Sequence, residues 1–233
     1  MNWQSNQISN SCINCPCRSP MFDLLDREEL ELVFQNKMTI HFKKGETIRK
    51  QGTHMSHVIS LNAGMVKLYL EGINHKNTII RMVTPTSFIG GPGIFLDQIH
   101  HFSISAIQDS TICFIDMLVF KQILENNRRF SEEFMKDLSR NMLSIYQRLI
   151  DLTQKQLAGR LADSLLYLFN DVFKSNSFEM CISKQDIADL TGVSLDSTLK
   201  TLREFKTEGI INYTHGSMEL LNPDALLRIS RTG

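Results

Sequence analysis

The feature that most restricts the fold of this chain is a long helical run between two differently patterned regions. Residues 130–154, FSEEFMKDLSRNMLSIYQRLIDLTQ, contain neither glycine nor proline, and about 20 helical residues already extend over roughly 30 Å. The apolar positions recur every three or four residues, close to a heptad seam; they are Phe134, Leu138, Met142, Ile145, Leu149 and Leu152. Packing of this helix on its own domain stays open, but so narrow and continuous a stripe favours pairing with a second copy of the chain.

The region before this helix has the pattern of a small antiparallel β-structure. Short apolar or alternating runs recur between positions 38 and 116, separated by glycine-containing turns. The runs are MTIHF, HVISL, MVKLYL, NTIIRMV, FSISAI and TICFID. This spacing predicts a sandwich or roll of short strands. A short helix is expected before the strands, over FDLLDREELELVF at residues 22–34.

The last third of the chain, from about Leu157, is helical again and then predicts a tight turn and a hairpin. Ser183 is a good N-cap for a helix that ends at Gly192, because glycine accepts the left-handed conformation of a helix C-cap. After the turn GVS, a second helix extends to Gly209, and the apolar pairs that follow flank a turn at residues 215–216. Helix, glycine-containing turn, helix and two-stranded wing together indicate a winged helix-turn-helix.

A helix-turn-helix places its second helix in the major groove of DNA, with the first turns facing the base edges. The positions expected to face DNA are Ser194, Asp196, Ser197, Lys200, Arg203 and Lys206. Lys200 suits guanine or phosphate, and Asp196 suits a cytosine amino group. Leu199 and Leu202 fit the packed side of the helix. The net charge is zero, so no general basicity supports DNA binding, and a plain helical hairpin with a solvated face stays the alternative.

Three cysteines stand close together near the start of the chain, in SCINCPCRSP at residues 11–20. No apolar run approaches the roughly 18 residues of a membrane helix, and the polar N-terminus lacks the order of a signal peptide. The expected compartment is therefore the cytoplasm, where thiols stay reduced. The chain has five cysteines, an odd number, so metal binding or redox chemistry suits Cys12, Cys15 and Cys17 better than a disulfide framework.

A metalloenzyme with a cupin-like roll is the competing class of protein. It would need inward-facing histidines followed by a glutamate on one strand, and the histidines here are scattered at His41, His54, His57 and His75. The sequence contains no recognisable glycine-rich phosphate loop or nucleophile–base arrangement. We therefore expect no catalytic site and no enzyme activity.

The order of these parts resembles the Crp/Fnr superfamily of bacterial transcription regulators along nearly the whole chain. The strings that carry the resemblance are FKKGETIRKQG, LNAGMVKLYL, SFIGGPGIF, GRLADSLLYL and ISKQDIADLTGVSLDSTLKTLREFKTEGII. The resemblance implies an α+β protein with an N-terminal antiparallel β-roll like that of cyclic-nucleotide-binding domains, a long dimerisation helix and a C-terminal winged helix-turn-helix. The implied segments are a cysteine-bearing part at 1–20, a sensor roll at 21–120, a dimerisation region at 121–155 and a DNA-binding domain at 156–233. The resemblance also implies a homodimer on a two-fold-symmetric promoter site in double-stranded DNA, with RNA polymerase as a candidate further partner and no membrane.

Two departures from the family pattern change what is expected. The usual recognition helix of the family carries Glu-x-x-Ser-Arg, where this chain has Asp196, Leu199 and Lys200. Lysine offers a point charge instead of a bidentate fork, so the target sequence is expected to differ from the common one. Members that bind cyclic AMP have Gly-Glu at the far turn of the roll and Arg-Ser further along. Here the turn is GGPG at 90–93 and QIHHFSIS follows, which argues against cyclic AMP.

In the Fnr branch of the family, three N-terminal cysteines and one cysteine of the roll hold a [4Fe-4S] cluster that oxygen or nitric oxide destroys. The resemblance assigns the same role here to Cys12, Cys15, Cys17 and Cys113, four thiolates as a cubane cluster needs. The chain would then sense oxygen, nitric oxide or redox state. Its C-x2-C-x1-C spacing is tighter than is usual for the branch.

Several alternatives to an iron–sulfur cluster stay open. The same thiolates would suit zinc, and a Cys15/Cys17 or Cys12/Cys15 pair would suit a thiol–disulfide switch. Cys113 would otherwise be an ordinary buried strand residue, and the roll would hold a small ligand. Haem is a minor alternative, for which the candidate axial ligands are His54, His57, His100 and His101. Cys181, at the start of the helix-turn-helix, is expected to be a packing residue.

Overall fold

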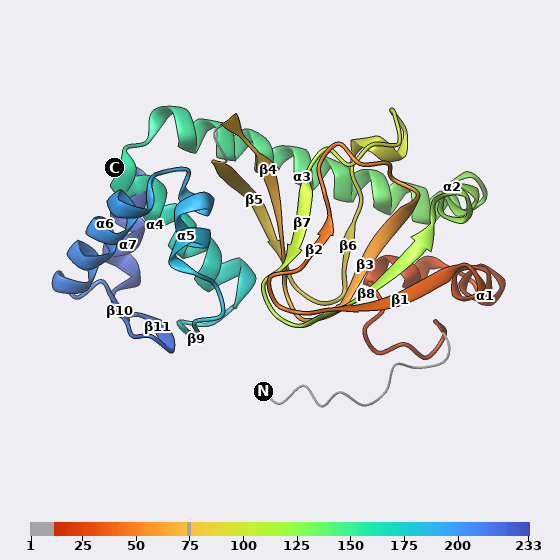
Figure 1. Ribbon diagram of the computed structural model, residues 1–233, viewed down its shortest axis with the longest axis horizontal. Coiled ribbons are helices and arrows are strands. Elements are labelled where there is room, and N and C mark those ends of the chain that lie inside the picture. Colours follow the sequence, from red (N-terminus) through yellow and green to blue (C-terminus); the bar gives the residue numbers. More distant parts are fainter. Residues whose placement is uncertain (1–11, 74–75) are drawn as a thin grey trace.

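The computed structural model describes residues 12–73 and 76–233; residues 1–11 of the predicted cysteine-bearing segment and His75 lie outside them. A β-roll comes first, a long helix then runs along one side of it, and a mainly helical domain follows beside the roll (Figure 1). This arrangement confirms the predicted fold class. No helix within the described part of the chain is long and apolar enough to cross a membrane.

The roll consists of two antiparallel four-stranded sheets. One sheet has the order β1 (Lys37–Phe42), β8 (Ser110–Asp116), β3 (His57–Ala63), β6 (Ser87–Ile89). The other has the order β2 (Thr47–Arg49), β7 (Ser103–Ala106), β4 (Val66–Glu71), β5 (Asn77–Val83). Every predicted run contains a strand. The strands β2 and β6 were not predicted, because three residues are too few to show alternation.

Alternate residues of each strand point into the space between the two sheets. In β8, Ile112 and Phe114 belong to this inner core, whereas Ile115 packs in a second core on the outer face. Cys113 therefore also faces outward, because side chains alternate along a strand. The outer core is completed by a 3-10 turn η1 (Pro20–Leu24), α1 (Arg27–Gln35), α2 (Met117–Asn126) and the beginning of α3 (Arg128–Gln154). A further 3-10 turn, η3 (Pro92–Ile94), follows β6.

The single helix predicted over residues 22–34 is wrong, because the chain breaks it at Asp26. Phe22 lies in η1, and α1 starts only after Asp26. Asp26 and Glu29 form a capping box: Asp26 Oδ1 accepts from Glu29 N at 2.8 Å, and Glu29 Oε2 accepts from Asp26 N at 2.9 Å. Such a cap starts a new helix and prevents the preceding turn from joining it.

The C-terminal domain is the predicted winged helix-turn-helix with one strand more than expected. Its elements are α4 (Leu157–Tyr167), a π-helical turn η4 (Leu168–Val172), β9 (Ser177–Glu179), α5 (Lys184–Thr191), α6 (Leu195–Thr207), β10 (Ile211–Tyr213), β11 (Ser217–Leu220) and α7 (Pro223–Thr232). Gly192 ends α5 in the left-handed conformation at φ 72°, as predicted. The wing is a three-stranded sheet in the order β10, β11, β9.

The roll and the C-terminal domain share one hydrophobic core. Met65, Ile79 and Met82 of the roll are buried in the same cluster as Leu161 of α4 and Ile187 of α5. Polar contacts reinforce this junction: the hydroxyl of Tyr167 accepts from Met82 N at 3.0 Å and donates to Met82 O at 3.2 Å. The position of the C-terminal domain against β5 is therefore fixed by both packing and hydrogen bonds.

Candidate functional site

Helix α6 presents the residues that were expected to face DNA. Ser194 is its N-cap and accepts from Ser197 N at 3.2 Å, while the two hydroxyls are 2.9 Å apart. Asp196, Lys200 and Arg203 are exposed. The opposite side of α6 is buried through Thr198, Thr201, Leu202 and Phe205. Leu202 therefore packs as predicted, whereas Leu199 is only half-buried.

The cationic residues of α6 differ in how they are held. Lys200 and Arg203 form no side-chain hydrogen bond or ion pair with other described residues, so both are free to meet an external partner. Lys206 instead joins α6 to the wing, because its Nζ donates to Tyr213 O at 2.8 Å and lies 4.9 Å from the centre of that ring. Lys184, at the start of α5, lies 4.7 Å from the same ring centre. Sequence reasoning missed Lys184 and Tyr213, since only the fold brings them together.

An ion pair fixes the first helix of the helix-turn-helix to the roll. Lys67 Nζ of β4 lies 2.5 Å from Asp186 Oδ1 of α5. Asp186 also belongs to the α5 capping box with Ser183, whose hydroxyl donates to Asp186 Oδ2 at 2.6 Å. Burial by itself would raise the pKa of the Asp186 carboxyl, but the hydrogen bonds from Lys67 and Ser183 outweigh burial and hold that pKa below its ordinary value.

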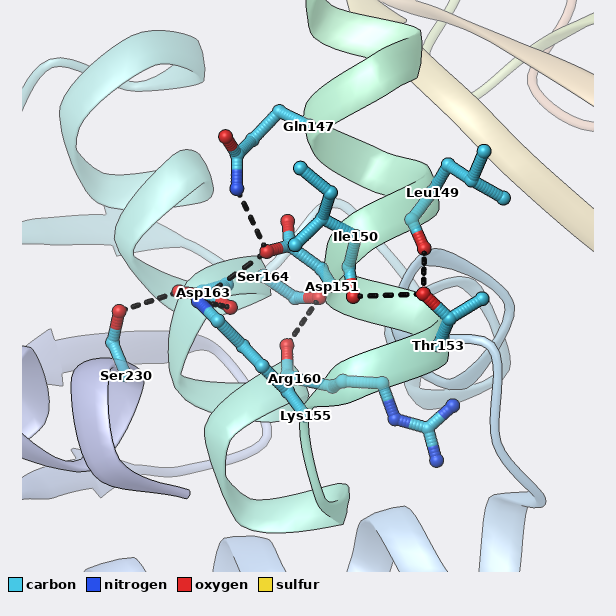
Figure 2. Close-up of polar contacts among 10 residues, drawn as sticks. All are labelled: Gln147, Leu149, Ile150, Asp151, Thr153, Lys155, Arg160, Asp163, Ser164 and Ser230. Carbon is cyan, nitrogen blue, oxygen red and sulfur yellow. Dashed lines mark hydrogen bonds and ion pairs between the residues drawn. The ribbon is translucent and has the colours of Figure 1, made fainter.

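A second polar cluster connects α3 to the DNA-binding domain (Figure 2). Lys155, between α3 and α4, lies 2.6 Å from Asp163 Oδ2 of α4 and 3.3 Å from Asp151 Oδ1 of α3. Ser230 of α7 donates to Asp163 Oδ1 at 2.5 Å, and Gln147 Nε2 donates to Asp151 Oδ1 at 3.1 Å. Lys155 thus ties the end of the long helix to α4, and Asp163 in turn joins α4 to α7 through Ser230.

The predicted dimerisation stripe needs a correction. Phe134 is 2% exposed and lies inside the outer core of its own roll, with its ring centroid 5.3 Å from that of Phe120. Leu138 packs against the same core, and Leu152 lies half-buried next to Gly192. Only Met142, Ile145 and Leu149 of the predicted stripe are exposed; the exposed apolar residues of α3 are Met135, Met142, Leu143, Ile145, Tyr146, Leu149 and Ile150. Phe134 and Leu138 at one end of the stripe pack on the roll, and Leu152 at the other end packs beside Gly192, so both ends serve the chain itself.

The four predicted sulfur ligands gather on the outer face of the first sheet. Cys113 Sγ is 3.4 Å from Thr39 Oγ1 of β1, and Cys15 Sγ accepts from Asn62 Nδ2 of β3 at 3.7 Å. Burial raises the pKa of the Cys12 thiol to about 11, and Cys113 and Cys15 contribute to the rise. Burial also raises the pKa of the Cys17 thiol, again with contributions from Cys15 and Cys113. All the described cysteines are free thiols.

Arg18 holds the cysteine segment in this position. Its Nη1 donates to Cys12 O and Ile13 O, each at 3.0 Å, and its guanidinium pairs with Asp23 of η1. The four sulfurs match a cubane cluster in number and kind. Within residues 12–73 and 76–233, however, no three or more His, Cys, Asp or Glu side chains are arranged so that they could hold a metal ion. The described positions of the sulfurs therefore do not by themselves fit a cluster.

The histidines named as candidate haem ligands have different surroundings. His57 Nδ1 lies 2.8 Å from Ser56 Oγ, and His101 Nε2 lies 3.1 Å from Asp97 Oδ1. His100 is 1% exposed, and neither ring nitrogen has a hydrogen-bond partner among the described residues. Burial, helped by Arg49 and His54, lowers the pKa of His100 to about 4, so its imidazole is neutral near pH 7.

Two family models match the chain in the order in which the domains occur. The model "Cyclic nucleotide-binding domain" matches residues 39–127, and the model "Crp-like helix-turn-helix domain" matches residues 159–229. The chain belongs to the Crp/Fnr family. Crp/Fnr regulators are dimeric transcription regulators that bind promoter DNA.

Relatives from bacteria match this Crp/Fnr protein over most of its length. The nitrogen fixation regulation protein FixK of Bradyrhizobium diazoefficiens is 27% identical over 91% of this chain and 90% of its own length. The transcriptional activator protein FnrL of Cereibacter sphaeroides is 20% identical over 88% of this chain and 85% of its own length. The structure of FixK2 from Bradyrhizobium japonicum has a TM-score of 0.76 at 16% identity, covering 84% of this chain and 98% of that one.

Proposed function

We propose that this Crp/Fnr protein is a DNA-binding homodimer that senses oxygen, nitric oxide or redox state through Cys12, Cys15, Cys17 and Cys113. The observation that carries the proposal is the gathering of the N-terminal thiols over the face of β8 that bears Cys113. The convergence of cysteines from the N-terminal segment and from the last strand of the roll supports a shared role. In this proposal the regulator acts in the cytoplasm, and RNA polymerase is a candidate further partner.

A packed path leads from these thiols to the dimer helix. Cys12 belongs to the same hydrophobic core as Phe120 of α2 and as Phe130 and Phe134 of α3. A chemical change at Cys12 alters the volume and polarity at one side of that core, and close-packed interiors transmit such changes. The beginning of α3 would shift against the roll, and the exposed middle of α3 would then meet its partner differently. DNA affinity follows, because a dimer engages two half-sites.

The sensing chemistry has two candidate forms. The first is a [4Fe-4S] cluster held by the four thiolates, supported by their number and by the family resemblance. The second is a thiol–disulfide switch, which is supported by sulfurs that gather without forming a ready metal site. In that form two thiols give two protons and two electrons to an oxidant such as diamide, and one S–S bond forms.

Anaerobic purification separates the two forms. The cluster form predicts a coloured preparation with stoichiometric iron and sulfide, loss of colour in air, and no retained iron in Cys113→Ala. Cys181→Ala is the matched control, because Cys181 lies in the DNA-binding domain away from the other thiols. The switch form predicts a colourless protein whose DNA affinity changes reversibly with diamide and dithiothreitol. A colourless protein whose DNA affinity is unchanged by air, nitric oxide and diamide would refute the sensing proposal.

The DNA-binding part is tested separately with a gel shift on promoter DNA from the protein's own operon. A metalloenzyme of the cupin type, the alternative class, would not retard this DNA. The expected result is a shift of the specific fragment that persists in excess unrelated duplex. A protein that retards no genomic fragment in any redox state would refute the proposal that it is a DNA-binding regulator.

A further inference from the structure

The loop that follows η3 presents three large apolar side chains to the outside of the protein. Phe95, Leu96 and Ile99 are exposed, although the residues that flank the loop, Ile94 and His100, are buried. Single apolar residues on a surface are ordinary, but three of them within five residues form a cluster, and exposed apolar clusters mark interaction sites. The loop is therefore a candidate contact surface.

Hydrogen bonds hold this loop in one conformation. Gln98 N donates to Gly93 O at 2.8 Å, and Gln98 O accepts from Met55 N at 2.7 Å. Asp97 Oδ1 accepts from Ile99 N at 3.1 Å. Gln98 also has a positive φ of 56°, an uncommon conformation for a residue other than glycine. Because the loop is already ordered, a partner that binds it loses little free energy to further ordering.

The exposed apolar surface of α3 begins next to this loop. The ring centroids of Phe95 and Phe134 are 6.1 Å apart, and the loop after β6 lies beside the first half of α3 (Figure 1). Met135, the residue after Phe134, is exposed. Met135, Met142 and Leu149 are seven residues apart and all exposed, so they lie on one side of α3. A second helix that packs along this side would reach the loop at the Met135 end.

We infer that Phe95, Leu96 and Ile99 belong to the dimer interface and pack on the beginning of α3 of a second copy of the chain. The inference rests on the proposed homodimer and extends its interface from the helix to the roll. Homodimer interfaces are more apolar than transient ones, and the loop and α3 together offer phenylalanine, leucine, isoleucine and methionine. A two-fold interface contains each contact twice, so both loops take part.

The loop is anchored in the core that contains Cys12. Ile94, at the beginning of the loop, and Met55, which donates to Gln98 O, are both buried in that core. Close-packed interiors transmit changes in volume, so a chemical change at Cys12 would displace the loop as well as the first turns of α3. The dimer interface would thus be linked to the thiols by a second route.

Sedimentation equilibrium of two matched leucine variants tests the inference. Leu96 in the loop and Leu118 in α2 are each 76% exposed, so Leu96→Ala and Leu118→Ala remove equally exposed side chains from two places. Leu96→Ala should raise the dissociation constant of the dimer at least tenfold, because the lost contact occurs twice. Leu118→Ala should change it less than twofold, and circular dichroism checks that both variants keep the fold. Equal dissociation constants of the two variants would overturn the inference.

Photo-cross-linking identifies what covers the loop. The full-length variants Leu96→p-benzoylphenylalanine and Leu118→p-benzoylphenylalanine are irradiated with and without RNA polymerase. The expected product has twice the mass of the chain, forms from position 96 and not from position 118, and joins the loop to a peptide of α3. Cross-links from position 96 to RNA polymerase alone, or to the same chain alone, would overturn the inference.

Failure of this inference is distinct from failure of the proposed function. A stable dimer in which Leu96 behaves like Leu118 overturns the loop interface and leaves the regulator proposal intact. A chain that is monomeric in every redox state overturns both.

Discussion

Phe134 and Leu149 lie on one predicted stripe, yet the structure gives them opposite roles. Phe134 is 2% exposed and its ring centroid lies 5.3, 5.9 and 6.1 Å from those of Phe120, Phe88 and Phe95. Phe134→Ala therefore removes a fully packed ring from the core of one chain. The expected loss in free energy of unfolding is about 3–5 kcal/mol per chain. Phe134→Leu, which keeps more volume, should lose less and serves as the variant that still folds.

Leu149 is 60% exposed in the single chain, so its remaining surface is available to a partner. Complete burial of a leucine stabilises by about 1.5–3 kcal/mol, and the exposed share then corresponds to about 1–2 kcal/mol per copy. A two-fold interface counts each contact twice, so Leu149→Ala should weaken the dimer by about 2–4 kcal/mol. At 1.4 kcal/mol per tenfold, the dissociation constant should rise by roughly 30-fold or more.

Sedimentation equilibrium measures the dissociation constant directly, and urea unfolding measures stability. The unfolding of a dimer includes its dissociation. The urea unfolding of the Phe134 variants is therefore measured in both the wild-type and the Leu149→Ala background. Effects on different parts of the molecule should add within about 0.5 kcal/mol. The reasoning fails if Phe134→Leu separates the dimer as strongly as Leu149→Ala does while leaving the unfolding of the chain unchanged.

Three further predictions follow from the described contacts. Lys200→Ala should weaken specific operator binding by roughly 1–3 kcal/mol in a gel shift; unchanged affinity and selectivity would remove Lys200 from the base-reading set. Lys67→Met leaves the buried Asp186 carboxyl without its ion-pair partner, so the pKa of Asp186 should rise. A carboxyl whose pKa is lowered by folding stabilises the protein only while it is ionised, so acid unfolding should begin at a higher pH than in wild type. An unchanged titration of the Asp186 carboxyl in NMR would contradict this. Burial holds the pKa of His100 at about 4, against 6.5 for an ordinary histidine. Between these pH values only the unfolded chain takes up the proton, so the free energy of unfolding should decrease by up to about 3 kcal/mol as the pH is lowered from 6.5 to about 4. His100→Leu should flatten this part of the unfolding curve, and an equally steep loss in the variant would show that other groups cause it.

The parts of the fold that the sequence made predictable are those with strong local signals. Helix α5 begins after Ser183 and ends at Gly192, as expected, because a capping box and a left-handed glycine depend only on neighbouring residues. The additional strand β9 has three residues and exists only because β11 pairs with it. The break at Asp26 was visible in principle as Asp-x-x-Glu, but the apolar stripe across it outweighed that signal.

The site was predictable only in pieces. The exposed face of α6 follows from helical periodicity, so the exposure of Asp196, Lys200 and Arg203 was predicted correctly. A heptad-like stripe, in contrast, does not show whether its residues pack on the roll of the same chain or on a second helix. Phe134 has the right spacing but packs on its own roll. The approach of Lys184 to the ring of Tyr213 could not be predicted from spacing at all, because only the fold brings the two residues together.

Helix α3 now explains how these sites are connected. Its first turns pack in the core that contains Cys12, its middle exposes an apolar surface, and its last turn is tied to α4 through Lys155 (Figure 2). A movement of α3 against the roll therefore reaches the DNA-binding domain directly at Asp163. The same domain is also held to the roll by Lys67 and Asp186. The DNA-binding domain is therefore held by ion pairs in two places, to α3 through Lys155 and to the roll through Lys67, in addition to the hydrophobic core that it shares with the roll.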